Sequence, residues 1–477
     1  MAFGGSGQSP VIDARPEPAV HRRTLAVGLV LSTSLVAFEV TSVLTALPTI
    51  SDELDGDSLY GATLAAYMLA NLVGLVAAGE QADRHGPRRP FIVCIAIFVV
   101  GLILAGVAND MIVVLLGRVV QGAGAGGLAP ITFALIGKVW PADGRATILA
   151  WVSAGWVLPS LIAPGLAGWI TNEIDWRWVF IGIAPLALVT AAVVVSAMGS
   201  LPPDPHLRAA RDRTSRVPLA LRLSLGVGLI IAGVQSSNAV LAISATVAGV
   251  ALGVPSFRRL MPDGVLRARP GLPAILACRT LATAAFLGAD SFIPLAADRI
   301  HGASATTQGF VIIGAALAWS VGSALSSRRS SADRNLARSS QGGFVLLIIG
   351  LAGVMPVLSA DWSLVATFAT WSVAGLGMGF LFVPTSAAAL EYADSGNEGT
   401  IGSQINLADN VGFALMGGLG GATVAASDRT QWPLSHALAS NLLLAILFAL
   451  VGLVLARGIA RRPSSGIMSH GDNYGDN

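Results

Sequence analysis

Three ionisable side chains lie deep inside long apolar runs of this sequence. Glu39, Arg118 and Asp290 each stand eight or nine positions from the proline or aspartate that ends the run on one side. A charge at such a depth in a membrane costs several kcal/mol, so it marks a candidate functional site. Two acids and one base of this kind could exchange protons, because a carboxylate holds its proton more tightly when it leaves a basic partner for an apolar cavity.

The helical rise puts the three groups at similar depths. At about 1.5 Å per residue, Glu39 would lie about 14 Å from the end of its helix, and Arg118 and Asp290 about 12 Å from the ends of theirs. We expect Glu39 to pair with Arg118, either as a proton-exchanging pair or as a static ion pair. Asp290 has no other basic residue at this depth. It could exchange protons or make a polar contact with a water-filled crevice.

A second group of polar and aromatic residues is predicted to line a central cavity for substrate. Asn406, Asp409 and Asn410 follow one another at helical spacing, where they could contact substrate, bind a proton or hydrogen-bond a neighbouring helix. Trp151 and Trp371 lie away from the span ends, and their ring faces attract cations, although packing alone is the simpler role.

The basic side chain of Arg279 is treated differently. It lies near one end of its predicted span. Long basic side chains in such places reach along the apolar surface to the membrane boundary. We therefore expect Arg279 to point toward the membrane surface and leave it out of the site.

The apolar runs themselves predict a membrane protein. Residues AVILMFWYC make up 54% of the 477 residues and charged residues only 12%, too few for a soluble surface. Runs of about 20 residues predict fourteen membrane-spanning helices in blocks of six, two and six. The spans are 24–50, 59–79, 91–108, 111–136, 146–171, 178–199, 219–234, 238–257, 272–297, 308–325, 343–359, 363–390, 401–426 and 437–457. The fold class is therefore all-α, a polytopic membrane protein of two six-helix bundles plus two extra central transmembrane helices.

The basic residues give the orientation. With the N-terminus inside, 24 of the 29 Lys and Arg residues fall in cytoplasmic segments and three in outer loops, as the positive-inside rule requires. Both termini are expected on the cytoplasmic side of the cell membrane. The predicted parts are a tail (1–23), an N-terminal bundle (24–199), a central segment with the two extra helices (200–271), a C-terminal bundle (272–457) and a disordered tail (458–477). Transporters built from two such halves bind substrate between them.

The loop at residues 79–89 is predicted to be a tight turn with a capping group. Gly86 can supply the positive φ that such a turn needs. Asp83 can cap the N-terminus of a facing helix or pair with an arginine, and a contact that forms and breaks would make this loop a latch between conformations. Arg88 could equally be an ordinary cytoplasmic anchor.

These motifs together resemble the major facilitator superfamily and, within it, the fourteen-span drug:proton antiporters. Residues 38–50 (FEVTSVLTALPTI) are similar to that group's first-span motif, L-D-x-T-x-V-N-V-A-L-P, with Glu39 in place of the aspartate. The loop motif G-x-x-x-D-R-x-G-R-R is matched, with one proline intruding, by Gly79, Asp83, Arg84, Gly86 and Arg88. The fourth-span motif R-x-x-Q-G-x-G is matched by Arg118, Gln121 and Gly122. The fifth-span motif G-P-x-x-G-G keeps Pro164 and Gly168, while two of its glycines are alanine here.

The resemblance implies a role for Arg118 in proton coupling. It also implies a proton-driven exporter of lipophilic or cationic small molecules, of the multidrug-efflux type, that works by alternating access. The partners would be the small-molecule substrate, protons and the lipid bilayer. We expect a monomer that uses the proton gradient and binds no cofactor, metal or nucleic acid. Two other functions on the same fold stay open: an uptake symporter or facilitator, and a lipid transporter. An enzyme is not indicated, because the sequence has no nucleophile–base group, metal-ligand spacing or phosphate-binding loop.

Overall fold

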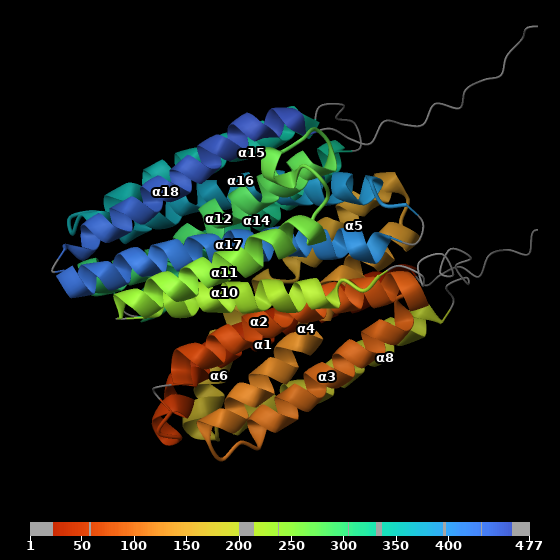
Figure 1. Ribbon diagram of the computed structural model, residues 1–477, viewed down its shortest axis with the longest axis horizontal. Coiled ribbons are helices and arrows are strands. Elements are labelled where there is room, and N and C mark those ends of the chain that lie inside the picture. The colour runs from red at the N-terminus through yellow and green to blue at the C-terminus, as the bar shows by residue number, and fades with distance from the viewer. Residues whose placement is uncertain are drawn as a thin grey trace, which may run out of the picture.

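The computed structural model describes residues 22–56, 59–199, 214–236, 238–303, 305–330, 336–394, 397–430 and 432–459. Every regular element in these ranges is a helix (Figure 1). The predicted tails fall almost entirely outside the described residues. In Figure 1 most of the N-terminal bundle lies below and the C-terminal bundle above, with α10 and α11 running along the boundary between them.

The helices follow the predicted spans closely. The N-terminal bundle consists of α1 (Arg22–Glu53), α2 (Tyr60–His85), α3 (Arg88–Gly106), α4 (Met111–Val139), α5 (Ala142–Ala154), α6 (Val157–Glu173), α7 (Arg177–Ile181) and α8 (Ile183–Met198). The central pair is α10 (Val217–Gln235) and α11 (Ala239–Leu260), followed by the 3-10 turn η2 (Val265–Arg267). The C-terminal bundle consists of α12 (Leu272–Asp290), α13 (Ile293–His301), α14 (Ala305–Ser330), α15 (Leu336–Val354), η3 (Met355–Leu358), α16 (Leu364–Glu391), α17 (Glu398–Thr430), α18 (Leu434–Leu455) and η4 (Ala456–Gly458).

The chain is a multi-pass membrane protein. Twelve helical segments of the described chain are long and apolar enough to cross a membrane, and both α10 and α11 are among them. Large apolar side chains on their outer faces are exposed, such as Val240 (76%) and Ile243 (66%) on α11, as expected for surfaces that face lipid. The helices α14 and α17 are 26 and 33 residues long but are not among the twelve, so the count of fourteen spans stays a prediction.

Three predicted spans are interrupted in the structure. Span 146–171 is divided between α5 and α6, span 178–199 between α7 and α8, and span 272–297 between α12 and α13. Each break lies just before a proline: Pro159, Pro185 or Pro294. Proline has no N–H, so it removes one hydrogen bond from the helix four residues earlier. At the first break the carbonyl of Gly155 accepts a hydrogen bond from the Ser34 hydroxyl instead (2.8 Å).

The two bundles meet along a small number of helices. The N-terminal part of α17 packs against α2 and α4, and α14 and α16 pack against α5. Helix α10 packs on α11 and also contacts both α2 and α17. We call the end of the molecule that carries the turn between α2 and α3 the inner end, which the sequence predicts to be cytoplasmic.

Candidate functional site

Glu39 of α1 and Arg118 of α4 form a buried ion pair, as the sequence predicts. An Arg118 Nη1 donates to Glu39 Oε1, and the side chain of Gln121, one turn further along α4, bonds to both partners. Gln121 Nε2 lies 2.9 Å from Glu39 Oε1, and its Oε1 lies 2.7 Å from Arg118 Nη1. The guanidinium also covers the ring of Tyr67 on α2, 4.0 Å from its centre. Glu39 has no exposed surface and Arg118 is 3% exposed, so removing either charge leaves the other buried without its opposite charge.

Asp290 lies at the break between α12 and α13. Its Oδ1 accepts a hydrogen bond from Trp371 Nε1 of α16 at 2.8 Å. Trp371 is fully buried and stacks on Phe286 of α12, with ring centres 4.8 Å apart and planes within 5°. As a whole residue, Asp290 is half-buried. Asp290 is therefore held by a neutral donor, while Glu39 is held by a cation.

Arg279 and Asp409 form a second buried ion pair, in the C-terminal bundle. Arg279 Nε and Nη2 donate to the two carboxylate oxygens of Asp409 at 3.1 and 2.6 Å. The prediction that Arg279 reaches the membrane surface is wrong: the residue is 3% exposed. It stays inside because α16 supplies three more acceptors to its Nη1, namely the Phe382 carbonyl and the hydroxyls of Thr385 and Ser386.

The remaining residues of the predicted cavity have mixed surroundings. Asn406 and Asn410 are half-buried on the same helix as Asp409, and Asn406 Nδ2 donates to the Gly402 carbonyl of its own helix (2.9 Å). Trp151 of α5 is 64% exposed, whereas Trp371 is fully buried. Two small cavities, one of them beside Arg279, are lined by other residues.

Asp83 joins the two bundles at the inner end. Its carboxylate accepts from the backbone N–H groups of Gly399 and Thr400 at 2.6 and 2.8 Å and from the Thr400 hydroxyl at 2.6 Å. These groups form the first turn of α17, so Asp83 caps a helix of the other half, which is one of the two roles that the sequence allows for it. A carboxylate at a helix N-terminus is stabilised by both the free N–H groups and the helix dipole.

Neighbouring residues of the loop motif support this cap. Gly86 has φ +78°, as predicted for the turn, and Arg84 pairs with Glu80 one turn earlier (2.7 Å). Gly79 lies where any side chain would overlap the Gly399 carbonyl and the Ser403 hydroxyl of α17, so α2 and α17 are in backbone contact here. Arg88 is exposed at the start of α3, which agrees with an anchoring role.

Two further contacts at the inner end were not found from the sequence. Arg145 of α5 donates to the Leu390 carbonyl of α16 (3.2 Å) and to the Gly137 carbonyl of α4 (2.7 Å), and so adds a second link between the halves. In the sequence, Arg145 is only a basic residue close to predicted span ends, and a residue that simply anchors a helix at the membrane surface looks the same.

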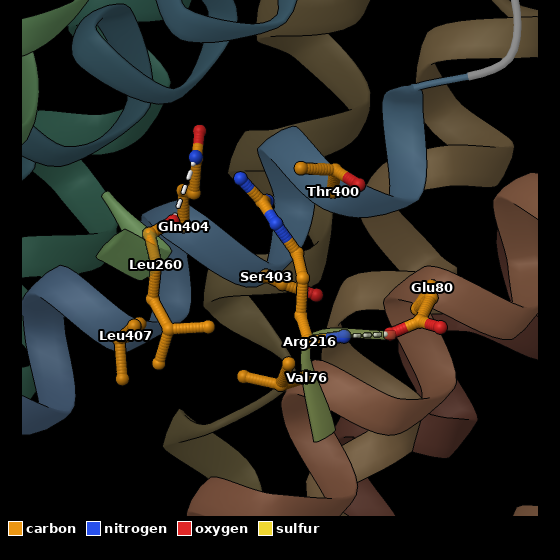
Figure 2. A pocket seen from close by; sticks show the side chains of 8 residues that line it. All are labelled: Val76, Glu80, Arg216, Leu260, Thr400, Ser403, Gln404 and Leu407. Carbon is orange, nitrogen blue, oxygen red and sulfur yellow. Dashed lines mark hydrogen bonds between the residues drawn. The ribbon is translucent and has the colours of Figure 1, made fainter. Parts of the chain in front are cut away.

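The second contact ties the central helices to both bundles. The Arg216 N–H, at the start of α10, donates to Glu80 Oε2 of α2 (2.7 Å), and Gln404 Nε2 of α17 donates to the Leu260 carbonyl at the end of α11 (2.9 Å). Figure 2 shows both bonds on either side of a small cavity that is also lined by Ser403. The hairpin of α10 and α11 thus spans the contact between α2 and α17.

Among the glycines and proline of the other motifs, only Gly122 lies in a close helix contact. Gly122 lies against the backbone carbonyl of Tyr67, so α4 and α2 touch there. Pro164 lies within α6 and is exposed. Gly168 of α6 has only an ordinary contact with the Thr45 methyl group, 3.9 Å from where a Cβ would stand.

Comparison with known proteins gives the class of this fold and site. The sequence profile of the Major Facilitator Superfamily matches residues 29–417, so the chain belongs to that family of membrane transporters, which move small-molecule substrates and are not enzymes. Among solved structures, the human organic anion transporter MFSD10 (TETRAN) superposes with a TM-score of 0.67 at 14% identity, over 91% of this chain and 99% of that one. The proton:xylose symporter XylE superposes with a TM-score of 0.64 at 12% identity, over 91% and 94%. At these identities the likeness shows the fold.

Similar sequences include both named and uncharacterised transporters. An uncharacterised MFS-type transporter of Mycobacterium tuberculosis is 28% identical over 307 residues, which is 61% of this chain but only 43% of that protein. Multidrug resistance protein 3 of Bacillus subtilis is 25% identical over 427 residues, 85% of this chain and 80% of that protein. The multidrug transporter protein MdtP of Bacillus subtilis is 32% identical over 179 residues, 37% of this chain and 33% of that protein.

Proposed function

We propose that this protein is a proton-coupled exporter of lipophilic or cationic small molecules that works by alternating access across the cell membrane, with both termini in the cytoplasm. The observation that carries the proposal is the buried group of Glu39, Arg118 and Gln121. An acid with no exposed surface can exchange a proton only when the protein opens a path to it, which links protonation to conformation. The names of the Bacillus relatives, a multidrug resistance protein and a multidrug transporter protein, support drugs as the substrate class.

Protonation of Glu39 would remove its attraction to Arg118 and free α1 to move relative to α4. Asp290 offers a second carboxylate in the other half, and it is the more accessible of the two. Binding of protons from outside would favour one facing state and substrate from inside the other, so that each exchange step completes half of the cycle. The Asp83 cap on α17 is broken whenever the inner end opens, and it therefore stabilises the state in which that end is closed.

The test is proton exchange in proteoliposomes that contain the purified full chain. A panel of lipophilic cations and neutral drugs is added to vesicles with an imposed pH gradient, and dissipation of the gradient is recorded. We expect Glu39→Gln to abolish substrate-dependent proton flux at a normal protein level, with Arg118→Ala equally damaging. Asp298→Asn, an exposed acid in α13, serves as the matched control. Normal coupled flux in the Glu39 variant would remove that residue from the mechanism, and substrate uptake driven by outside acid would identify a symporter instead.

A further inference from the structure

Four arginines lie close together at the inner end of the central hairpin. Arg258 and Arg259 are in the last turn of α11, and Arg267 and Arg269 follow in the connection to α12. All four are exposed. Because α11 and α12 are both long and apolar enough to cross a membrane, the connection between them lies at the membrane surface. We call these four residues the arginine cluster.

Backbone hydrogen bonds fold the connection into a compact turn. The N–H groups of Arg267 and Arg269 both donate to the Gly264 carbonyl, at 3.0 and 3.2 Å. The turn is also joined to the C-terminal bundle, because the Gly271 N–H donates to the Gly458 carbonyl of η4 (3.1 Å). The backbone that carries the arginines of the turn is therefore held in place close to the end of α11.

The positive charge of the arginine cluster is not balanced by acids of the described residues. None of the four side chains takes part in the ion pairs found in this part of the chain. Between residues 214 and 271 the sequence has six arginines and no lysine, and Asp263 is its single acid. Such an excess of one charge attracts counter-ions, so the cluster is suited to bind an anion from its surroundings.

An exposed apolar stripe of α11 leads to the arginine cluster. Val247, Val250 and Val254 are exposed, and they precede Arg258 by 11, 8 and 4 residues. This spacing puts the three valines and Arg258 on one face of the helix. A molecule that lies along this face contacts the valines with its apolar part and has its charged group at Arg258.

The combination of charged and apolar side chains favours a phospholipid over a soluble anion. Leu266 lies in the turn directly before Arg267 and is exposed. A soluble anion such as free phosphate gains nothing from Leu266 or from the valines of α11, whereas the acyl chains of a lipid pack against both. Arginines just beyond a membrane-spanning helix attract anionic headgroups, and a guanidinium can donate two hydrogen bonds to one phosphate group.

We propose that the arginine cluster and the exposed stripe of α11 bind an anionic phospholipid of the leaflet at the inner end. Its phosphate lies at the arginines and its acyl chains lie along the valines. This site goes beyond the proposed function and does not depend on it, because it requires neither proton coupling nor export. Leu260, next to Arg259, is the residue whose carbonyl accepts from Gln404 of α17 (Figure 2). The bound lipid therefore lies beside the attachment of the central hairpin to the C-terminal bundle.

The experiment measures binding of phosphatidylglycerol, with a fluorophore on one acyl chain, to the full chain in a neutral detergent. Fluorescence anisotropy gives the affinity, and phosphatidylcholine with the same fluorophore is the matched lipid whose headgroup has no net charge. We expect phosphatidylglycerol to bind at least about tenfold more tightly than phosphatidylcholine. Replacing the whole cluster by glutamine should remove most of this preference and leave phosphatidylcholine binding unchanged. The substitutions of this cluster variant are Arg258→Gln, Arg259→Gln, Arg267→Gln and Arg269→Gln.

A second quadruple variant tests whether the effect is specific to this place. It removes four other exposed arginines at the inner end, which lie on α1, α3 and α15, and it changes the net charge equally. The substitutions are Arg22→Gln, Arg23→Gln, Arg89→Gln and Arg338→Gln. We expect this variant to bind phosphatidylglycerol within about twofold of the unaltered protein. Equal losses in the two variants would show only the general attraction of basic residues for anionic lipid, and would overturn the site.

Other results would also overturn the site. These are equal affinity for the two lipids, an unchanged preference in the cluster variant, and displacement of phosphatidylglycerol by excess inorganic phosphate, which would assign the cluster to a soluble anion. A dimer of the unaltered protein that dissociates in the cluster variant would assign the surface to a second copy of the chain.

Monodisperse elution and an unchanged thermal midpoint without added lipid show that each variant is folded. If the cluster variant is not, the double variants Arg258→Gln/Arg259→Gln and Arg267→Gln/Arg269→Gln are measured separately, and each should weaken phosphatidylglycerol binding at least about threefold. Because the assay involves no transport, absence of proton-driven flux in vesicles would refute the proposed function and leave this result unaffected.

Discussion

Replacing Asp83 by asparagine should shift the protein toward the state in which its inner end is open. The carboxylate accepts three hydrogen bonds from the first turn of α17, at 2.6, 2.8 and 2.6 Å. Asparagine keeps one acceptor oxygen, and its NH₂ group cannot accept from the N–H groups it faces. Hydrogen bonds to a charged group contribute about 1.5–3 kcal/mol each, and the charge at the helix N-terminus adds about 0.3–1 kcal/mol. When the halves separate, water hydrogen-bonds the groups that Asp83 had held, so part of this energy is recovered. We therefore expect Asp83→Asn to destabilise the closed inner end by about 2 kcal/mol, which is about a 30-fold change in the equilibrium between the closed and open states.

The assay is the distance between spin labels at two exposed inner-end positions, His85 of α2 and Arg338 of α15. The two native cysteines are buried and are replaced beforehand, so that only these positions are labelled. The longer of two distance populations should grow in Asp83→Asn and stay unchanged in Asp143→Asn, an exposed acid at the start of α5. If the populations in Asp83→Asn match those of the parent, the cap does not hold the inner end closed and the energetic reasoning is refuted.

Three further predictions concern stability. Arg279→Ala should destabilise the protein by about 3–5 kcal/mol because it leaves Asp409 buried without its cation; thermal unfolding in detergent should show this, and the double variant Arg279→Met/Asp409→Leu should recover most of the loss. Gly375→Leu should lower the same thermal midpoint because α14 leaves no room for a side chain, whereas Gly165→Ala, with no atom within 4 Å of its added methyl group, should leave it unchanged or raise it. Gln404→Leu removes the donor to the Leu260 carbonyl, at a cost of about 1 kcal/mol, and should speed amide hydrogen exchange at the end of α11; unchanged exchange there would contradict an anchoring role.

The positions of the helices and the first ion pair could be predicted from the sequence because both follow from burial along a single chain. Apolar runs near 20 residues fixed where helices lie, and the shared depth of Glu39 and Arg118 anticipated their contact. The positive φ of Gly86 was predictable because it depends on local chemistry at a turn. For Asp83 the sequence offered capping as one of two roles, and it did not show that the capped helix is α17, more than 300 residues away.

Contacts between helices were harder to predict, because the depth of a residue along its helix axis does not show which helices are its neighbours. Arg279 was expected at the membrane surface, yet α16 and α17 surround it with acceptors that lie more than 100 residues away in sequence. Prolines within the predicted spans gave only a partial signal for the helix breaks: Pro159, Pro185 and Pro294 follow breaks, whereas Pro130 and Pro384 lie inside continuous helices. Helices α4 and α16 each have glycines 11, 13 and 15 residues after their first residue, and this equal spacing indicates which residues of the two halves correspond.

The central hairpin is attached on both sides of the contact between α2 and α17, which separates in the proposed transport cycle. Glu80 holds the start of α10 to one half, and Gln404 holds the end of α11 to the other. If the inner ends move apart, α10 and α11 must either tilt together within the lipid or lose the hydrogen bond to Glu80 or to Gln404. The surrounding bilayer would resist that tilt, so membrane thickness and lateral pressure become part of what determines how fast the protein can turn over.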